Sequence, residues 1–141
     1  MSSAGSLLGC VALVTGSAKR LGRAVALRLA AEGADVVVHY RTSAAEAESA
    51  VAEIEKLGRR AVSVAANLDS VSEIRRLFDE TAKQFGRLDI LVNSAANFLP
   101  ASIVSTTEEI WEASLDSNLK APFFLCAGGG AVALAGEGDD C

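Results

Sequence analysis

The sequence predicts an α/β protein with a Rossmann-type, doubly wound parallel sheet that is incomplete, with four strands and a possible fifth. Two observations predict this class. Short apolar runs alternate along the chain with segments of helical periodicity, which is the order of elements in α/β folds. The apolar runs are continuous rather than alternating, as in parallel strands that helices cover on both faces. We therefore expect a sheet enclosed between two layers of helices.

The first half of the pattern contains two strands and two helices. Apolar runs predict strands, and apolar residues at helical spacing predict helices. Gly33 and Gly58 follow the two helical segments and end them, while Ser43 and Glu46 form a capping box at the start of the second. Strands are predicted at 10–15 and 35–40, and helices at 21–32 and 43–57.

The second half repeats this order. Ser70 with Glu73, and Thr106 with Glu109, have the spacing of capping boxes at the starts of two further helices, the first of which ends at Gly86. Strands are predicted at 61–65 and 88–92, and helices at 70–86 and 106–124.

The last residues depart from the pattern. The segment "CAGGGAVALAGEGDDC" has no helical periodicity and becomes acidic and glycine-rich. Within it, "GGGAVALA" is the possible fifth strand. The sequence therefore predicts one domain over 1–127 and an irregular, glycine-rich acidic tail over 128–141.

Composition excludes several classes of protein. Half of the residues are hydrophobic and 22% are charged, which predicts a folded chain. The net charge of −5 argues against nucleic-acid binding, and the apolar runs are too short to cross a membrane. The N-terminus lacks the basic region of a signal peptide, so a soluble cytoplasmic protein is expected. Cys10, Cys126 and Cys141 lack CxxC spacing and His39 is the only histidine, so no metal site is expected.

The segment "VTGSAKRLGRA" lies between the first strand and the first helix. Gly16 is suited to a tight turn and Gly22 to close packing of the helix on the strand. A helix N-terminus after a parallel strand also binds phosphate groups. The spacing does not match a Walker A loop, because five residues separate the glycines and Arg23 follows the second. We interpret the turn as a dinucleotide site, the alternative being an ordinary structural turn.

Three segments resemble one family. "TGSAKRLG" is similar to the Thr-Gly-x-x-x-Gly-x-Gly motif of short-chain dehydrogenase/reductases, with Arg20 at the middle glycine. "LVNSAANFLP" resembles the family's Asn-Asn-Ala-Gly stretch, and "SLDSNLKAPFFL" its asparagine-containing helix. Arg20, "HYRTSAAEA" and the Phe-x-Pro sequence are similar to the pteridine reductase branch. The resemblance covers roughly residues 8–125.

The end of the second strand indicates which dinucleotide is bound. Folds specific for NAD place a carboxylate there for the ribose hydroxyls, whereas this strand is followed by Arg41. Arg20 and Arg41 can converge on a 2′-phosphate, with Ser43 donating at the helix start. NADPH is therefore the expected cofactor. Ser43 is equally a helix cap, and His39 is better interpreted as a packing residue than as a catalyst.

The family resemblance implies roles for further residues. Asn67 and Leu68 would lie against the adenine, and Asn93, Ser94 and Ala95 beneath the nicotinamide ribose. Asn93 is also a suitable strand-end turn residue. Phe98 would stack on the substrate ring, although a loop aromatic is more often a core residue. The expected cofactor-binding set is Gly16, Arg20, Leu21, Gly22, His39, Tyr40, Arg41, Ser43, Asn67, Leu68, Asn93, Ser94 and Ala95.

The catalytic part of the family pattern is missing from this sequence. The resemblance implies a Tyr-x-x-x-Lys pair, but the only tyrosine is Tyr40, and Ala44 follows it at the lysine spacing. Asn118 matches the family's proton-relay asparagine, and a polar residue that bends or caps a helix is the alternative interpretation. Asn118 alone cannot act as an acid, so the chain is expected to be truncated and inactive by itself.

Three hypotheses about function remain open. The first is a short-chain reductase that uses NADPH to reduce a C=O or C=N bond of a small, pteridine-like or other carbonyl substrate. The second is a non-catalytic NADP(H)-binding module or decoy subunit, and the third is a frameshifted fragment without an independent role. The resemblance implies a homo-oligomer, an expectation that the shortened last helix weakens for this chain.

Overall fold

Four parallel strands form the sheet, in the spatial order β3-β2-β1-β4. The computed structural model describes residues 5–135. The strands are β1 Val11–Val14, β2 Asp35–Tyr40, β3 Ala61–Ala65 and β4 Ile90–Val92. The helices are α1 Arg20–Ala31, α2 Ala44–Lys56, α3 Val71–Phe85, α4 Glu108–Leu115, the π-helix η1 Asp116–Lys120, and α5 Ala121–Ala135. The α/β class and the parallel sheet are thereby confirmed.

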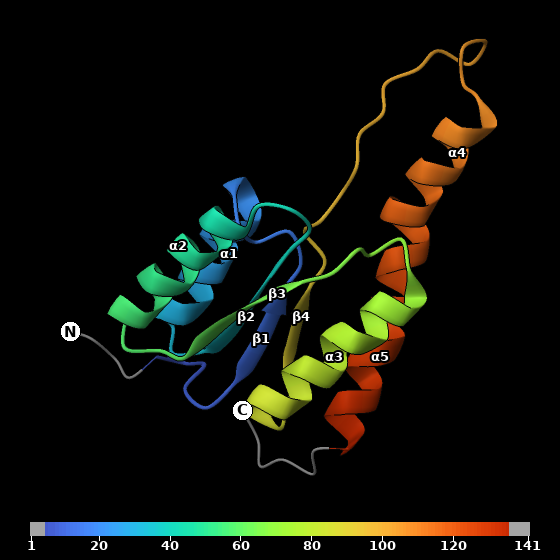
Figure 1. The fold of residues 1–141 in the computed structure, drawn as a ribbon. Helices are drawn as coiled ribbons and strands as arrows, with labels where there is room; N and C mark the ends of the chain where they lie inside the picture. Colours follow the sequence, from blue (N-terminus) through green and yellow to red (C-terminus); the bar gives the residue numbers. More distant parts are fainter. Residues whose placement is uncertain (1–4, 136–141) are drawn as a thin grey trace.

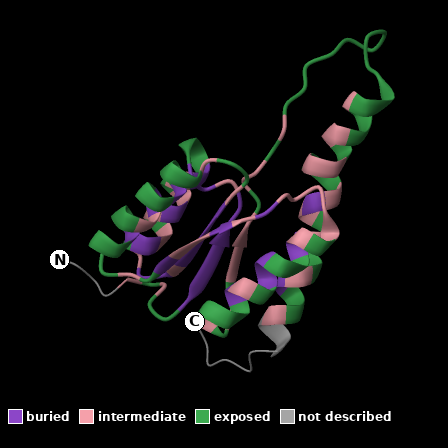
Figure 2. Ribbon diagram, in the orientation of Figure 1, coloured by how far each residue is buried: buried purple, intermediate pink, exposed green. Residues whose placement is uncertain are grey.

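Helices cover both faces of the sheet (Figure 1). The helices α1 and α2 lie on one face, and α3 and α5 lie on the other. Leu13 and Val37 are fully buried against the α3 and α5 side, where they pack in the same cluster as Phe78. Val36 and Val38 are fully buried in the cluster on the α1 and α2 side. Because neighbouring residues face two different cores, the strands are largely apolar, and Figure 2 shows β1 and most of β2 as buried and β4 as intermediate.

The helices α4, η1 and α5 follow one another without a break from residue 108 to residue 135. The π turn of η1 inserts a local irregularity, of the kind that often occurs at functional sites. Residues 93–107, which precede α4, form neither helix nor strand and extend away from the sheet (Figure 1). Among residues 5–135, no helix is both long enough and apolar enough to span a membrane.

The expectation of an irregular tail from residue 128, with a possible fifth strand, is wrong over residues 128–135, which are the last part of α5. The packing of Gly128 shows why these glycine-rich residues can be helical. Its α-carbon lies against the ring of Phe78, so that any side chain at this position would overlap the ring. The absence of a side chain lets α5 pack closely on α3, and this packing offsets the low helix propensity of glycine. Residues 136–141 of the expected tail lie outside the described residues.

The helix starts agree with the predicted capping boxes in part. The hydroxyl of Ser70 accepts a hydrogen bond from the backbone N–H of Glu73, as predicted. Ser43 precedes α2 but its side chain makes no cap hydrogen bond, so the predicted box is not formed there. At α4 the cap is Thr107 instead of Thr106, because Thr107 accepts from the N–H of Ile110.

Candidate functional site

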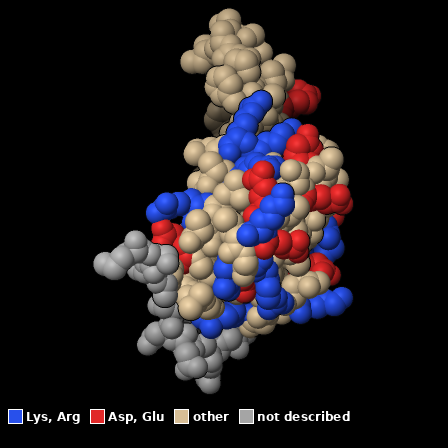
Figure 3. Space-filling model, turned by 90° about the vertical axis from the view of Figure 1, so that its left-hand side faces the viewer, with Lys and Arg blue, Asp and Glu red and all other residues tan. Residues whose placement is uncertain are grey.

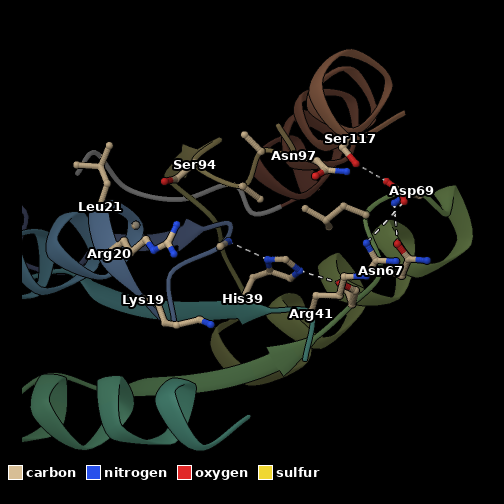
Figure 4. A pocket seen from close by; sticks show the side chains of 16 residues that line it. Lys19, Arg20, Leu21, His39, Arg41, Asn67, Asp69, Ser94, Asn97 and Ser117 are labelled. Atoms are coloured by element: carbon tan, nitrogen blue, oxygen red, sulfur yellow. Dashed lines mark hydrogen bonds and ion pairs between the residues drawn. The ribbon is translucent and has the colours of Figure 1, made fainter. Parts of the chain in front are cut away.

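A pocket of about 580 Å³ lies at the carboxyl ends of the strands. In an open parallel sheet, this is the edge where ligands bind, next to the strand at which the order of the strands reverses. Its walls come from the β1–α1 turn, the end of β2, the segments that follow β3 and β4, and η1 (Figure 4). The lining residues are Gly16, Lys19, Arg20, Leu21, Gly22, His39, Arg41, Ala66, Asn67, Leu68, Asp69, Ser94, Ala95, Ala96, Asn97 and Ser117.

Glycine is required at two positions of the β1–α1 turn. Gly16 has a φ of +61°, a conformation that side chains disfavour, and an added Cβ would lie 3.0 Å from the α-carbon of Ala95. A Cβ on Gly22 would overlap the carbonyl of Gly16. The turn therefore folds back onto the first turn of α1, which brings the N-terminus of that helix to the pocket.

Arg20 begins α1 with a φ of +54°, the only positive φ of a non-glycine residue among those described. This is the position at which the resembling motif has its middle glycine. A side chain in the left-handed region costs energy, and such strain is concentrated at functional sites. Arg20 and Lys19, the N-cap residue, both line the pocket, and the first turn of α1 contains no acidic residue. The turn is thus basic where the helix dipole is also positive.

His39 is a buried residue that connects two walls of the pocket. Its Nδ1 accepts a hydrogen bond of 2.9 Å from the N–H of Gly16, and its Nε2 lies 2.9 Å from the carbonyl oxygen of Ala66. Nδ1 must therefore be unprotonated and Nε2 must carry the hydrogen. Burial lowers the pKa of His39, and this effect outweighs the bond to Ala66, which raises it. His39 is thus a neutral structural residue, in agreement with its interpretation as a packing residue.

Arg41 and Asp69 meet at the rim of the pocket, with Arg41 Nη1 3.8 Å from Asp69 Oδ2. The other oxygen of Asp69 accepts a hydrogen bond of 2.9 Å from the hydroxyl of Ser117 in η1. Asp69 also receives a bond on its backbone carbonyl from Lys120 Nζ. One carboxylate therefore connects the end of β2 to the π-helix across the pocket (Figure 4).

Asn67 and Leu68, expected against the adenine, line the pocket beside Ala66. The side-chain oxygen of Asn67 accepts the N–H of Asp69 at 3.1 Å, and its backbone N–H donates to Glu73. The asparagine therefore also shapes its own loop, as asparagine commonly does in turns.

The chain that leaves β4 is held by Thr15 at the end of β1. The hydroxyl oxygen of Thr15 accepts hydrogen bonds of 3.0 Å from the N–H groups of both Ser94 and Ala95. Ser94 and Ala95 line the pocket, as expected for residues near the ribose, whereas Asn93 does not and donates from its side chain to Cys126 Sγ.

Asn118 lies next to the pocket without lining it. Its Oδ1 accepts the N–H of Asn97 at 2.9 Å, and its Nδ2 donates to the carbonyl of Asn97 at 2.7 Å. The side chain thus holds the segment after β4 against η1, a structural role different from the helix bend or cap that was the alternative interpretation. Its neighbour Ser117 is the η1 residue that reaches the pocket.

The structure brings most of the expected cofactor residues together and leaves some apart. Phe98 is 86% exposed and is not among the lining residues, so its stacking role remains a prediction. The expected residues that do not line the pocket are Tyr40, Ser43, Asn93, Phe98 and Asn118.

The pocket also contains residues that the sequence interpretation did not include. Lys19 had a usable signal, because it lies between the two glycines, and Asp69 follows the expected adenine segment directly. Ser117 of η1 had no such signal, because it lies far along the chain from the other lining residues that it contacts. The additional lining residues are Lys19, Ala66, Asp69, Ala96, Asn97 and Ser117.

Basic and acidic side chains are mixed over the outer face of α1 and α2. Figure 3 views the molecule from this side and shows Lys and Arg next to Asp and Glu rather than gathered in one patch. Arg23, for example, pairs with Glu53 of α2 at 3.1 Å. The cations that line the pocket are thus a local feature of the β1–α1 turn and the end of β2.

The chain is similar to known proteins in both sequence and structure. The family model for short chain dehydrogenases matches residues 10–132. The hydroxynaphthalene reductase-like protein Arp2 of Metarhizium robertsii is 41% identical over 120 residues, which are 85% of this chain and 45% of that protein. The short chain dehydrogenase/reductase AacuN of Aspergillus aculeatus is 41% identical over 119 residues, which are 84% of this chain and 45% of that protein.

Solved structures of similar fold include short-chain dehydrogenases as well. A short chain dehydrogenase from Burkholderia cenocepacia in complex with NADP has a TM-score of 0.86 at 41% identity, covering 89% of this chain and 51% of that one. A blue fluorescent protein from a metagenomic library in complex with NADPH has a TM-score of 0.87 at 34% identity, covering 90% and 52% of the two chains. The chain therefore spans about half the length of the relatives that it matches.

Proposed function

This chain belongs to the short-chain dehydrogenase family, and on that premise we propose that its pocket binds NADP(H) as the cofactor part of an oxidoreductase. The main support for this proposal is the positive charge at the end of β2. Arg41 lies there instead of a carboxylate, and it lines the same pocket as Lys19 and Arg20. A ribose 2′-phosphate needs such cations, whereas unmodified ribose hydroxyls need an acceptor.

The rest of the pocket supports a dinucleotide. The turn from Gly16 to Gly22 and the N-terminus of α1 provide the position for the pyrophosphate. Asn67 and Leu68 form the wall where the adenine would lie, and Ser94 and Ala95 form the wall near the nicotinamide ribose. Two of the structural relatives are complexes with NADP and with NADPH, which supports NADP(H) as the dinucleotide.

The reaction proposed for the whole enzyme is reduction of a C=O or C=N bond of a small substrate. Bound NADPH would supply the hydride, and a nearby acid must supply the proton. Relatives named hydroxynaphthalene reductase-like favour a ring substrate, and a pteridine-like substrate remains the narrower proposal from the sequence motifs. Phe98 is the residue we propose for stacking on that ring.

This chain by itself is proposed to bind the cofactor without turnover. Tyr40, its only tyrosine, is not among the lining residues of the pocket. The side chain of Asn118 is held by the backbone of Asn97 and has no acidic proton to give. The second candidate function, a non-catalytic NADP(H)-binding module, is favoured by the lack of a tyrosine among the lining residues of the pocket.

The test compares NADPH and NADH binding by calorimetry, using the wild type, Arg20→Ala and Arg41→Ala. Charge-assisted hydrogen bonds contribute about 1.5–3 kcal/mol, so we expect each variant to weaken NADPH binding by about 10- to 100-fold. Binding of NADH should change little, since it has no 2′-phosphate. Arg28→Ala is the matched control, because Arg28 is an exposed α1 arginine that pairs with Glu32 away from the pocket. Equal affinity of the wild type for both dinucleotides would refute the proposal.

A further inference from the structure

We propose that His39 is a positioning residue for the cofactor, whose neutral imidazole fixes the β1–α1 turn relative to the segment after β3. This inference rests on the proposed function, because these two segments are the walls between which the dinucleotide would lie. His39 itself does not need to touch a reacting atom. Its role is to set the position of Gly16 and Ala66, both of which line the pocket.

The geometry shows a connection through both the backbone and the side chain. The carbonyl oxygen of His39 accepts a hydrogen bond of 3.0 Å from the N–H of Ser17. The imidazole then accepts from the N–H of Gly16 through Nδ1 and donates to the carbonyl of Ala66 through Nε2, each over 2.9 Å (Figure 4). Because His39 is only 2% exposed, water cannot readily replace either bond.

The bond to Gly16 also decides which N–H groups are left for a ligand. The N–H of Gly16 is directed at Nδ1, so phosphate groups would be met by the first turn of α1, which begins at Arg20. Gly16, which has a φ of +61°, lacks a Cβ, so its backbone is free to adopt many other conformations. The hydrogen bond from its N–H to the imidazole of His39 therefore restrains the most flexible residue of the turn.

Protonation would break this arrangement. A proton on Nδ1 converts the acceptor into a donor that faces the N–H of Gly16, and two donors repel. Charged side chains of both signs line the same pocket as His39. The turn contributes Lys19 and Arg20, the end of β2 contributes Arg41, and the segment after β3 contributes the single carboxylate, Asp69.

Two substitutions separate the two imidazole bonds. In His39→Asn the amide oxygen occupies the place of Nδ1 and can still accept from Gly16, but the donor to Ala66 is lost. In His39→Gln the amide nitrogen reaches the place of Nε2 and can still donate to Ala66, but the acceptor for Gly16 is lost. Both variants replace a buried ring by a smaller amide, so they serve as controls for each other.

The experiment measures the dissociation constant of NADPH at about pH 7.5 and about pH 5.5, across the range in which histidine titrates. At the higher pH we expect His39→Asn to bind within about threefold of the wild type and His39→Gln to bind about tenfold more weakly, the effect of one lost hydrogen bond. The wild type should lose more affinity on acidification than His39→Asn, which has no group to protonate. Equal affinity of His39→Gln and the wild type would overturn the inference.

A second readout does not depend on the cofactor. Amide hydrogen exchange at Gly16, followed by NMR, should be slow in the wild type and in His39→Asn and faster in His39→Gln. If the wild type binds no NADPH at the higher pH, the proposed function fails, and the exchange rates still decide whether His39 holds the turn. Equal exchange at Gly16 in all three proteins would refute the positioning role, whatever the affinities. Circular dichroism of each variant confirms that the comparison is made on folded protein.

Discussion

Arg41 and Asp69 form an ion pair across the rim of the pocket, with Arg41 Nη1 3.8 Å from Asp69 Oδ2. Arg41 is the more exposed partner, and Asp69 is held from behind by the hydroxyl of Ser117. The pair therefore places a fixed carboxylate beside the cation proposed for the 2′-phosphate. A phosphate that binds Arg41 must compete with Asp69 for it and must also tolerate its negative charge.

Replacing Asp69 by asparagine is expected to strengthen NADPH binding. The amide keeps an oxygen for the hydroxyl of Ser117 but releases Arg41 and removes one negative charge from the rim. An exposed ion pair contributes about 0.2–1 kcal/mol, so an increase in affinity of about two- to fivefold is expected. Calorimetric titration at low and high salt measures it, and the gain should shrink with salt. Weaker binding of NADPH by Asp69→Asn would contradict this prediction.

Arg20 is expected to lower the stability of the fold while it raises the preference for NADPH over NADH. Arg20→Gly relieves the left-handed conformation and should leave the free energy of unfolding equal to that of the wild type or higher by up to about 1 kcal/mol. The same change removes the guanidinium, so the preference for NADPH over NADH should fall. Arg20→Ala is the control, since it loses the guanidinium but keeps the strain. Urea unfolding and dinucleotide titration of both variants test this; a clear loss of stability only in Arg20→Gly would disprove it.

Gly128 and Gly130 form a matched pair in α5. A methyl group at Gly128 would overlap the ring of Phe78, whereas nothing lies within 4 Å of one at Gly130. Gly128→Ala should therefore lower the free energy of unfolding by about 1–3 kcal/mol through overpacking. Gly130→Ala should raise it by about 0.5–1 kcal/mol, because alanine is the better helix former. Urea unfolding monitored by circular dichroism distinguishes them, and equal effects of the two changes would show that α5 does not pack on α3 in this way.

Acid should destabilise the fold in two separate pH ranges. Burial lowers the pKa of His39 below its ordinary 6.5, so below that pH the unfolded chain binds more protons and the free energy of unfolding falls. Burial raises the pKa of Asp89, but its bonds with Arg87 and with the N–H of Val11 outweigh this and lower it below 3.8. The contribution of Asp89 is therefore complete above pH 3.8 and is lost as the pH falls below it.

The two ranges can be assigned with single variants. His39→Asn should remove the loss of stability just below pH 6.5 and leave the more acidic loss in place. Asp89→Asn should do the reverse. Unfolding in urea at a series of pH values measures both, and a wild-type stability that is constant through the histidine range would contradict the neutral, buried state of His39.

Thr15 is expected to stabilise the fold through the hydrogen bonds of its hydroxyl group rather than through the packing of its side chain. Thr15→Val keeps the volume but leaves the N–H groups of Ser94 and Ala95 without their acceptor, which should cost about 1–2 kcal/mol for two hydrogen bonds. Thr15→Ser keeps the oxygen and should cost less. Thermal unfolding of the two variants gives the comparison, and a valine variant as stable as the serine one would show that these bonds do not hold the β4 segment.

Most of the fold was predictable because its local signals agree. Continuous apolar runs marked the strands, and Gly33, Gly58 and Gly86 marked the helix ends; all three have a positive φ in the structure. The end of α5 was not predictable, because its glycines have low helix propensity and are tolerated only by contact with Phe78. That contact joins residues that are distant in sequence, so no local pattern records it.

The candidate site was predictable where one short segment builds it. Gly16, Arg20 and Gly22 act within a single turn, and the structure places them together as the spacing indicated. The contact between Asp69 and Ser117 was not predictable, because the two residues are 48 positions apart in the sequence and no local pattern joins them. The predicted cap at Ser43 failed for a related reason: local spacing allows a capping bond but does not require it.

The pairing of β4 with β1 also bears on when the pocket forms during folding. β1 pairs with β2 and also with β4, and the bond from the N–H of Val11 to Asp89 joins residues 78 positions apart. Contacts between such distant parts of a chain form slowly, because a long loop must close first. Ser94 and Ala95 reach their wall only after that step. We therefore expect the refolding chain to pair β1, β2 and β3 before β4 docks, and to bind a nucleotide only after β4 is in place.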